Sequence, residues 1–177
     1  MALSRTLNPP ARRWIAASPL IYLVHDLEEL ATARDWVGAN WHRLPRVLVS
    51  WLGGDIDLTH VYAVAIAIIL VAMAAVAIAA ASPRATRTML TVFTLCVMLR
   101  LSNALLHLGQ AAFTRAYVPG LVTALLLVLP YSIWLIMRLE RGALVRHEAV
   151  HVLFIGGLLL QIPVIGAVLL LAALLAR

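Results

Sequence analysis

Ionisable side chains stand inside apolar stretches of this sequence, at spacings that suit a metal site or a proton-transfer site. Residues 25–29 read His-Asp-Leu-Glu-Glu. In a helix that turns about 100° per residue, Glu28 and Glu29 flank His25 on one face. Imidazole nitrogens and carboxylate oxygens form the mixed ligand set that zinc and non-haem iron favour, and the same groups act as general acids and bases. The pentapeptide therefore predicts either a metal centre or acid–base chemistry.

A second polar face lies on the apolar segment 88–114. The residues that share this face, within an arc of about 80°, are Arg100, Asn103, His107, Gln110 and Thr114. An ionised residue at the middle of a membrane helix costs about 2.5–3.5 kcal/mol on insertion scales, so such a face usually points into a protein interior. A rise of about 1.5 Å per residue places this face and Glu29 at similar depths when both segments enter from the same side. The predicted catalytic cluster comprises His25, Glu28, Glu29, Asn103 and His107.

Roles within the cluster follow from side-chain chemistry. His25, Glu29 and His107 are the predicted metal ligands, with His60 as a less favoured further ligand, and the expected ion is zinc or non-haem iron. Without a metal, the same side chains would exchange protons and need no cofactor. Arg100 is expected to neutralise one of the two glutamates. The residues expected to support the cluster from outside are Asp26, Gln110 and Asp57.

Two blocks of this sequence resemble a known family. Residues 25–29 resemble the signature of the HXXEE family of small bacterial integral membrane proteins. Residues 103–107 and 117–124 are similar to that family's second block, a histidine-bearing helix followed by a helix start that reads Tyr-Val-Pro-Gly-Leu-Val-Thr-Ala here. The resemblance covers residues 17–137. It implies a compact helical membrane domain and does not supply a settled reaction.

A competing motif lies at residues 147–151, which fit the H-E-x-x-H pattern of zinc proteases. Arg138, Arg141 and Arg146 precede it, as is typical of a membrane boundary. No aspartate, glutamate or histidine follows it to act as a third ligand. We therefore predict a solvated helix start at this motif, not a zinc site.

Composition indicates a membrane protein. Apolar residues make up 63% of the chain and charged residues 12%, whereas a soluble domain carries about 25% charged residues. Mean hydropathy is +0.96. All 14 basic residues are arginines, and the formal net charge is +6. In so apolar a chain this excess favours contact with anionic lipid headgroups over nucleic-acid binding.

The apolar segments predict an all-α protein. At about 20 apolar residues per crossing, about five transmembrane helices are expected, at residues 14–33, 61–81, 88–114, 119–137 and 150–176. Tryptophan and leucine recur at helical spacing in residues 41–52, which is typical of a short interfacial helix. Gly156, Gly157 and Pro163 predict close packing and a kink in the last span. We expect a polytopic helical bundle that forms a single membrane domain over residues 1–177.

Arginine counts predict the orientation. Alternating connections place eight arginines on the side of the N-terminus and five on the other side. Because cytoplasmic loops carry the excess of basic residues, the N-terminus is expected in the cytoplasm, with the chain in a bacterial inner membrane.

The expected function is that of a membrane-embedded enzyme. A buried histidine–glutamate centre, with or without a metal, would act on a lipophilic small molecule of lipid or isoprenoid type. A proton-coupled transporter or proton relay that uses the same carboxylates is an alternative, and a structural or partner-binding subunit is a second one. The chain has no internal repeat, which argues against alternating access within one chain. A homo-oligomer would supply that symmetry.

Overall fold

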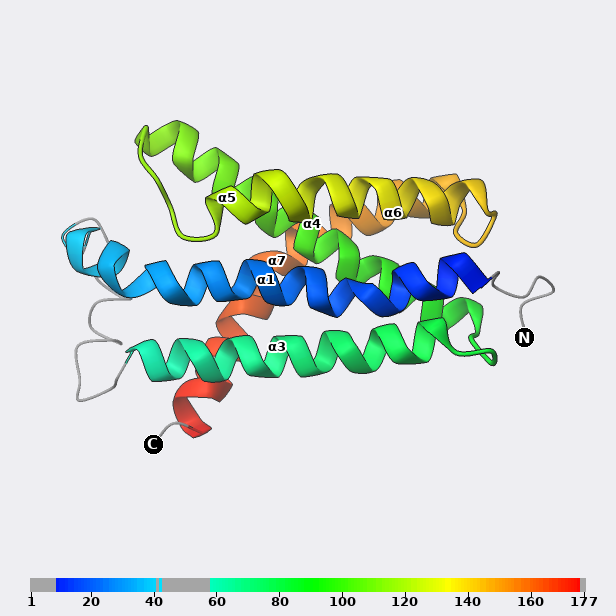
Figure 1. Cartoon of the computed structure of the whole chain (residues 1–177), viewed down its shortest axis with the longest axis horizontal. Helices are drawn as coiled ribbons and strands as arrows, with labels where there is room; N and C mark the ends of the chain where they lie inside the picture. Colours follow the sequence, from blue (N-terminus) through cyan, green and yellow to red (C-terminus); the bar gives the residue numbers. More distant parts are fainter. Residues whose placement is uncertain (1–8, 41, 43–57, 176–177) are drawn as a thin grey trace.

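The fold, given by a computed structural model, is described for residues 9–40, 42 and 58–175. Regular structure in these residues is helical, which confirms the predicted all-α fold class. The helices are α1 (Pro9–Asn40), α3 (Leu58–Ala81), α4 (Arg87–Thr114), α5 (Leu121–Thr123), the π-helix η2 (Ala124–Val128), α6 (Leu129–Arg141) and α7 (His147–Leu175). In Figure 1, α1, α3 and the rod formed by α5, η2 and α6 run side by side, while α4 and α7 cross them obliquely.

Four of these helical spans are long and apolar enough to cross a membrane, namely Thr59–Ala81, Arg87–Thr114, Leu121–Arg141 and His147–Leu175. By length and composition the chain is therefore an integral membrane protein. Helix α1 has 32 residues, yet the acids in residues 26–29 lower its hydropathy. It nevertheless lies along α3 for the length of the bundle (Figure 1). Helix α1 begins at the end of the bundle opposite to that where α7 finishes (Figure 1).

Local sequence explains where the helices near the site begin and end. The Thr86 hydroxyl accepts the backbone N–H of Met89 and caps the start of α4. Helix α4 stops where Arg115 takes a left-handed conformation, with φ of 51°. Gly120 is left-handed as well, with φ of 78°, and immediately precedes α5. Pro130 has no N–H to donate to the preceding turn, and the helix widens into the π-turn η2 just before it.

Packing positions α1 and α4 for polar contact. Helix α1 packs most extensively against α3, and α4 against α7. A Cβ on Gly157 of α7 would lie 2.9 Å from the carbonyl carbon of Met98 on α4, so this glycine allows the two backbones to approach closely. Between α1 and α4, long polar side chains make the contact.

The helices extend beyond the predicted spans. Helix α1 runs unbroken from Pro9 to Asn40 and contains the predicted span 14–33, but it is not one of the four helices named above as apolar enough to cross a membrane. Helix α7 is helical from His147 to Leu175, Pro163 included. The predicted interfacial helix at residues 41–52 lies, except for residue 42, outside the described residues.

Candidate functional site

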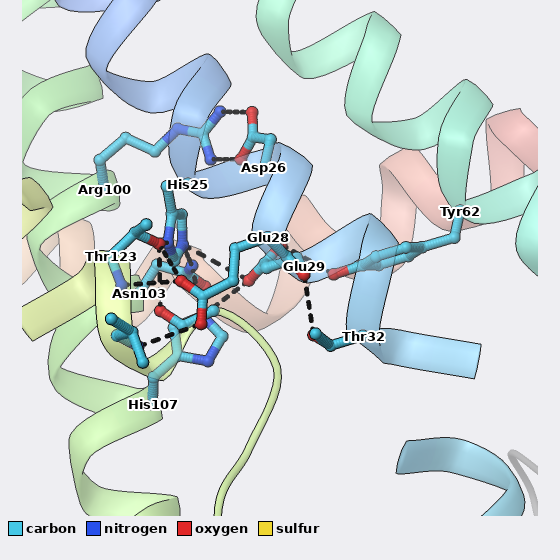
Figure 2. A network of polar contacts seen from close by, with 12 residues as sticks. His25, Asp26, Glu28, Glu29, Thr32, Tyr62, Arg100, Asn103, His107 and Thr123 are labelled. Carbon is cyan, nitrogen blue, oxygen red and sulfur yellow. Dashed lines mark hydrogen bonds and ion pairs between the residues drawn. The ribbon is translucent and has the colours of Figure 1, made fainter. Parts of the chain in front are cut away.

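Two histidines and a carboxylate converge between α1 and α4 (Figure 2). His25 and Glu29 are one turn apart on α1, and His107 comes from α4. The carboxylate atom Glu29 Oε1 lies 3.5 Å from His25 Nε2 and 2.7 Å from His107 Nε2. One ligand atom from each residue lies within 4.8 Å of those of the other two, and among the described residues no other histidines, cysteines or carboxylates form such a group of three. His25 is fully buried and Glu29 is 8% exposed. The structure thus brings together the three predicted ligands.

Asn103 lies in the same cluster. It stands one helical turn before His107, and its amide nitrogen Nδ2 lies 2.9 Å from His107 Nε2 and 3.3 Å from His25 Nε2. Its Oδ1 atom accepts a 2.9 Å hydrogen bond from Nε2 of Gln161 on α7. A polar amide thus links the two imidazoles to a third helix.

Glu29 is held from its other side by a phenol. The hydroxyl of Tyr62, near the start of α3, donates a 2.8 Å hydrogen bond to Glu29 Oε2. A tyrosine at the end of an apolar span usually belongs to the membrane interface, so the sequence alone does not mark Tyr62 as part of a site.

Glu28 lies apart from the cluster and caps the start of α5. Its carboxylate accepts the backbone N–H groups of Val122 and Thr123, at 3.1 and 2.7 Å, and the hydroxyl of Tyr117 at 2.7 Å. Free N–H groups at a helix N-terminus favour such a carboxylate. Glu28, predicted as catalytic, therefore joins α1 to the start of the next helical rod.

A hydroxyl connects this cap to the cluster (Figure 2). The Thr123 hydroxyl lies 2.5 Å from Glu28 Oε2 and 2.9 Å from His25 Nδ1. Because a hydroxyl has one hydrogen, which goes to the carboxylate, Thr123 Oγ1 accepts the Nδ1–H of His25. This leaves the Nε2 lone pair of His25 directed at the cluster, which is the arrangement found in histidines that bind metals.

Arg100 does not pair with Glu28 or Glu29 as predicted. Both of its terminal nitrogens bind the two carboxylate oxygens of Asp26, at 2.7 and 2.8 Å. Helices α1 and α4 run in the same direction (Figure 1), so earlier residues of one meet earlier residues of the other. Asp26 therefore meets Arg100, and Glu29 meets His107. The prediction was wrong because the helical angle alone does not set this register.

A cavity of about 300 Å³ opens beside the cluster. The polar side chains that line it include Asp26, Glu29, Asn103, His107 and Gln161. Its walls are apolar side chains of α3, α4 and α7 that include Ile66, Ile69, Leu99, Val164, Ile165 and Val168. The cluster thus borders a space suited to an apolar molecule.

The other predicted residues lie further out. Gln110 also lines the cavity but is exposed. His60 is exposed near the start of α3 and is not one of the three clustered ligands. Asp57 lies outside the described residues.

Gly120 was not among the predicted site residues, yet its backbone lies close against the cluster. A Cβ at this position would lie 2.7 Å from Glu29 Cγ and 2.8 Å from His25 Cε1. Gln161 was not predicted either, although a polar amide inside an apolar span indicates a functional position, as the predicted polar residues of the segment 88–114 do. The sequence could therefore have indicated Gln161, and Thr123 belongs to the second block of the resemblance, whereas no pattern in the sequence marks Tyr62.

The H-E-x-x-H motif makes other contacts. His147 Nδ1 pairs with Glu140, and His151 Nδ1 donates to the carbonyl of His147 at 3.1 Å. His147, Glu148 and His151 are exposed. Among the described residues they form no group with a third ligand. That the motif is not a zinc site stays a prediction.

Comparison with known proteins gives one match. A family model described as a protein of unknown function with HXXEE motif matches residues 16–135. The chain belongs to the HXXEE family. No curated protein and no solved structure matches it.

The HXXEE signature of this chain combines two tasks. His25 and Glu29 face His107, while Glu28 caps α5. The second block completes both, because it contains His107, Gly120 and the segment that Glu28 caps. The match ends before α7, which carries Gln161 and one apolar wall of the cavity.

Proposed function

We propose that this HXXEE protein is a membrane-embedded enzyme that acts on a lipophilic small molecule at a metal ion held by His25, Glu29 and His107. The observation that supports this most strongly is the convergence of two imidazoles and a carboxylate beside a largely apolar cavity, which Glu29 and His107 line. A substrate of lipid or isoprenoid type would come from the bilayer itself. Ordinary packing does not account for three ionisable groups in one buried place.

The donor set fits a transition metal. Two histidines and one carboxylate suit zinc and also the facial triad of non-haem iron. Bonds of about 2.0–2.1 Å in a tetrahedron put ligand atoms roughly 3.3 Å apart, close to the 3.5 Å between His25 Nε2 and Glu29 Oε1. For a metal to bind, the distance of 2.7 Å between Glu29 Oε1 and His107 Nε2 must increase, and the Asn103 amide must rotate away from the histidines. A metal bound there would supply a Lewis acid for an oxygen of the substrate.

The surrounding side chains have definable tasks. Thr123 holds the tautomer of His25, and Tyr62 fixes the second oxygen of Glu29. The amide of Asn103 offers an N–H to a substrate oxygen once it turns from the histidines. The apolar walls exclude water, which strengthens each of these polar interactions.

Metal analysis tests the proposal. Wild-type protein purified from metal-supplemented cells should contain about one metal ion per chain, because three ligands are already in place. His25→Ala, Glu29→Ala and His107→Ala should each lose most of it. The matched control is the double variant His147→Ala/His151→Ala, which removes both histidines of the H-E-x-x-H motif and should retain the metal. Elemental analysis by mass spectrometry measures all five proteins.

Two results would overturn the proposed centre. One is metal that stays in the three cluster variants and disappears from the control. The other is a wild-type protein that contains no metal but loses its cellular function in Glu29→Gln. That result would indicate acid–base chemistry or a proton relay in place of a metal centre.

We propose that the chain lies in a bacterial inner membrane, and the arginine distribution supports an orientation with the N-terminus in the cytoplasm. Because α1 begins and α7 finishes at opposite ends of the bundle, the end of α7 is then outside. Alkaline phosphatase fused after Arg177 should be active, because it folds only outside the cytoplasm, and the same enzyme inserted between Pro83 and Arg84 should be inactive. The reverse pattern of activities would invert the orientation.

A further inference from the structure

The cluster has a closed side and an open side. On the closed side lies the backbone of Gly120, where a Cβ would lie 2.8 Å from His25 Cε1 and 2.7 Å from Glu29 Cγ. On the open side, Glu29 and His107 line the cavity, whereas His25 does not. A substrate in the cavity would therefore approach a bound metal ion past Glu29 and His107.

Tyr62 contacts the cluster from the open side. It belongs to α3, is partly buried and lines the cavity. Figure 2 shows its side chain extending from α3 to Glu29. The Tyr62 hydroxyl donates a hydrogen bond of 2.8 Å to Glu29 Oε2. Oε2 is therefore the carboxylate oxygen that is turned towards Tyr62 and α3.

The two oxygens of Glu29 have different partners. Oε1 lies 2.7 Å from His107 Nε2 and 3.5 Å from His25 Nε2, so it is the oxygen placed to share a metal with both imidazoles. Among the described residues, the Tyr62 hydroxyl is the one hydrogen-bond donor to Oε2. A carboxylate binds a metal through either one oxygen or two. This single hydrogen bond therefore bears on how Glu29 would bind.

We infer that Tyr62 is a positioning residue. By holding Oε2, it makes Glu29 bind the metal through Oε1 alone, and this leaves a coordination position on the cavity side for an oxygen of the substrate. Catalytic zinc sites and the facial triad of non-haem iron both need such an open position. The inference rests on the proposed function and adds the residue that keeps the metal accessible from the cavity.

Loss of the phenol has a definite consequence for Glu29. This residue is 8% exposed, so little water can reach Oε2 in place of the Tyr62 hydroxyl. A buried acceptor without a donor is unfavourable, and a metal bound to Oε1 would be a positive charge within reach of the same carboxylate. Oε2 would then bind the metal as well and occupy the position that faces the cavity.

Cobalt(II) as a probe tests this inference. Its visible absorption becomes weaker as it gains ligand atoms, and X-ray absorption counts those atoms. The full chain, freed of metal in detergent, should bind about one Co²⁺ per chain, and Tyr62→Phe should bind Co²⁺ with one more oxygen ligand and weaker visible absorption. Loss of a hydrogen-bond partner of a metal ligand weakens metal binding about 10–100-fold. The second oxygen offsets part of this loss, so we expect about tenfold weaker binding in Tyr62→Phe.

Tyr131→Phe is the matched control. The Tyr131 hydroxyl donates a hydrogen bond of 2.6 Å to the carbonyl oxygen of Trp14, and Tyr131 neither belongs to the cluster nor lines the described cavity. This variant loses the same chemical group and should bind Co²⁺ with the affinity and the spectrum of wild type. Thermal unfolding of both variants shows whether each one folds.

Two results would overturn the inference. One is a Tyr62→Phe protein whose cobalt spectrum and ligand count equal those of wild type. The other needs no variant, so it applies even where Tyr62→Phe does not fold. Infrared spectra of wild type that contains isotope-labelled glutamate should show, on addition of Co²⁺, the wide separation of the two carboxylate stretching bands that one-oxygen binding gives. The narrow separation of two-oxygen binding would contradict the inference.

The same measurements separate this inference from the proposed function. Wild-type protein that binds no Co²⁺ contradicts the proposed function, and this inference with it. Wild-type protein that binds Co²⁺ through both oxygens of Glu29 contradicts this inference alone.

Discussion

Gly120→Ala should lose most of the bound metal and unfold at a lower temperature. The backbone at Gly120 has φ of 78°, and the left-handed region costs an L-residue about 1–2 kcal/mol. The added Cβ would also lie 2.7 Å from Glu29 Cγ and 2.8 Å from His25 Cε1. Neither side chain can withdraw freely, because Thr123 holds the first imidazole and Tyr62 holds the carboxylate. The clash must therefore displace two of the three proposed ligands.

Elemental analysis and thermal unfolding in detergent measure both effects. Gly109→Ala on α4 is the matched control, because a Cβ there meets no atom within 4 Å. In a helix, alanine is favoured over glycine, so the control should be at least as stable as wild type and keep its metal. Full metal content in Gly120→Ala would show that the cluster is looser than its contacts indicate.

Asp26→Ala should be among the most destabilising single changes in the chain. Asp26 is 1% exposed and Arg100 is 8% exposed. Removal of one partner leaves the other as an uncompensated buried charge, which costs about 3–5 kcal/mol. The double variant Asp26→Leu/Arg100→Met removes both charges with apolar side chains of similar length, so it should recover most of the lost stability.

Unfolding by titration with sodium dodecyl sulfate gives the free energies. Glu148→Gln is the control, because it breaks the exposed pair with Arg146, whose atoms lie 3.3 Å apart. Such surface pairs contribute little, and the control should unfold as wild type does. A double variant no more stable than Asp26→Ala would mean that the pair stabilises the fold beyond balancing two charges.

Periodicity accounts for the part of the site that the sequence could predict. His25 with Glu29, and Asn103 with His107, are one turn apart on otherwise apolar helices, so angle and depth suffice to bring them together. The partner of Arg100 required the register between two helices. Helical angle places Asp26 and Glu29 only about 60° apart, and this difference is too small to choose between them.

The contacts of Glu28, Tyr62 and Thr123 were not predicted, because they too depend on how separate elements pack together. Glu28 belongs to the signature, but its partners are backbone N–H groups. These groups point at Glu28 only because the chain turns at Gly120 and begins α5. Tyr62 and Thr123 act through hydroxyls whose direction depends on tertiary packing. The fold class was easier to predict, because a backbone in lipid must have its polar groups paired, and continuous apolar runs of about 20 residues achieve this as helices.

The contacts of α1 also have a consequence for the order of synthesis. Asp26 pairs with a residue 74 positions later in the chain, and Glu28 with one 95 positions later. At about 5–20 residues per second, the ribosome needs roughly 5–20 s to make the segment between Glu28 and its partner. Through that interval the first helix carries acids whose partners do not yet exist. The helix that bears the family signature is thus made well before the segments that pair with Asp26 and Glu28.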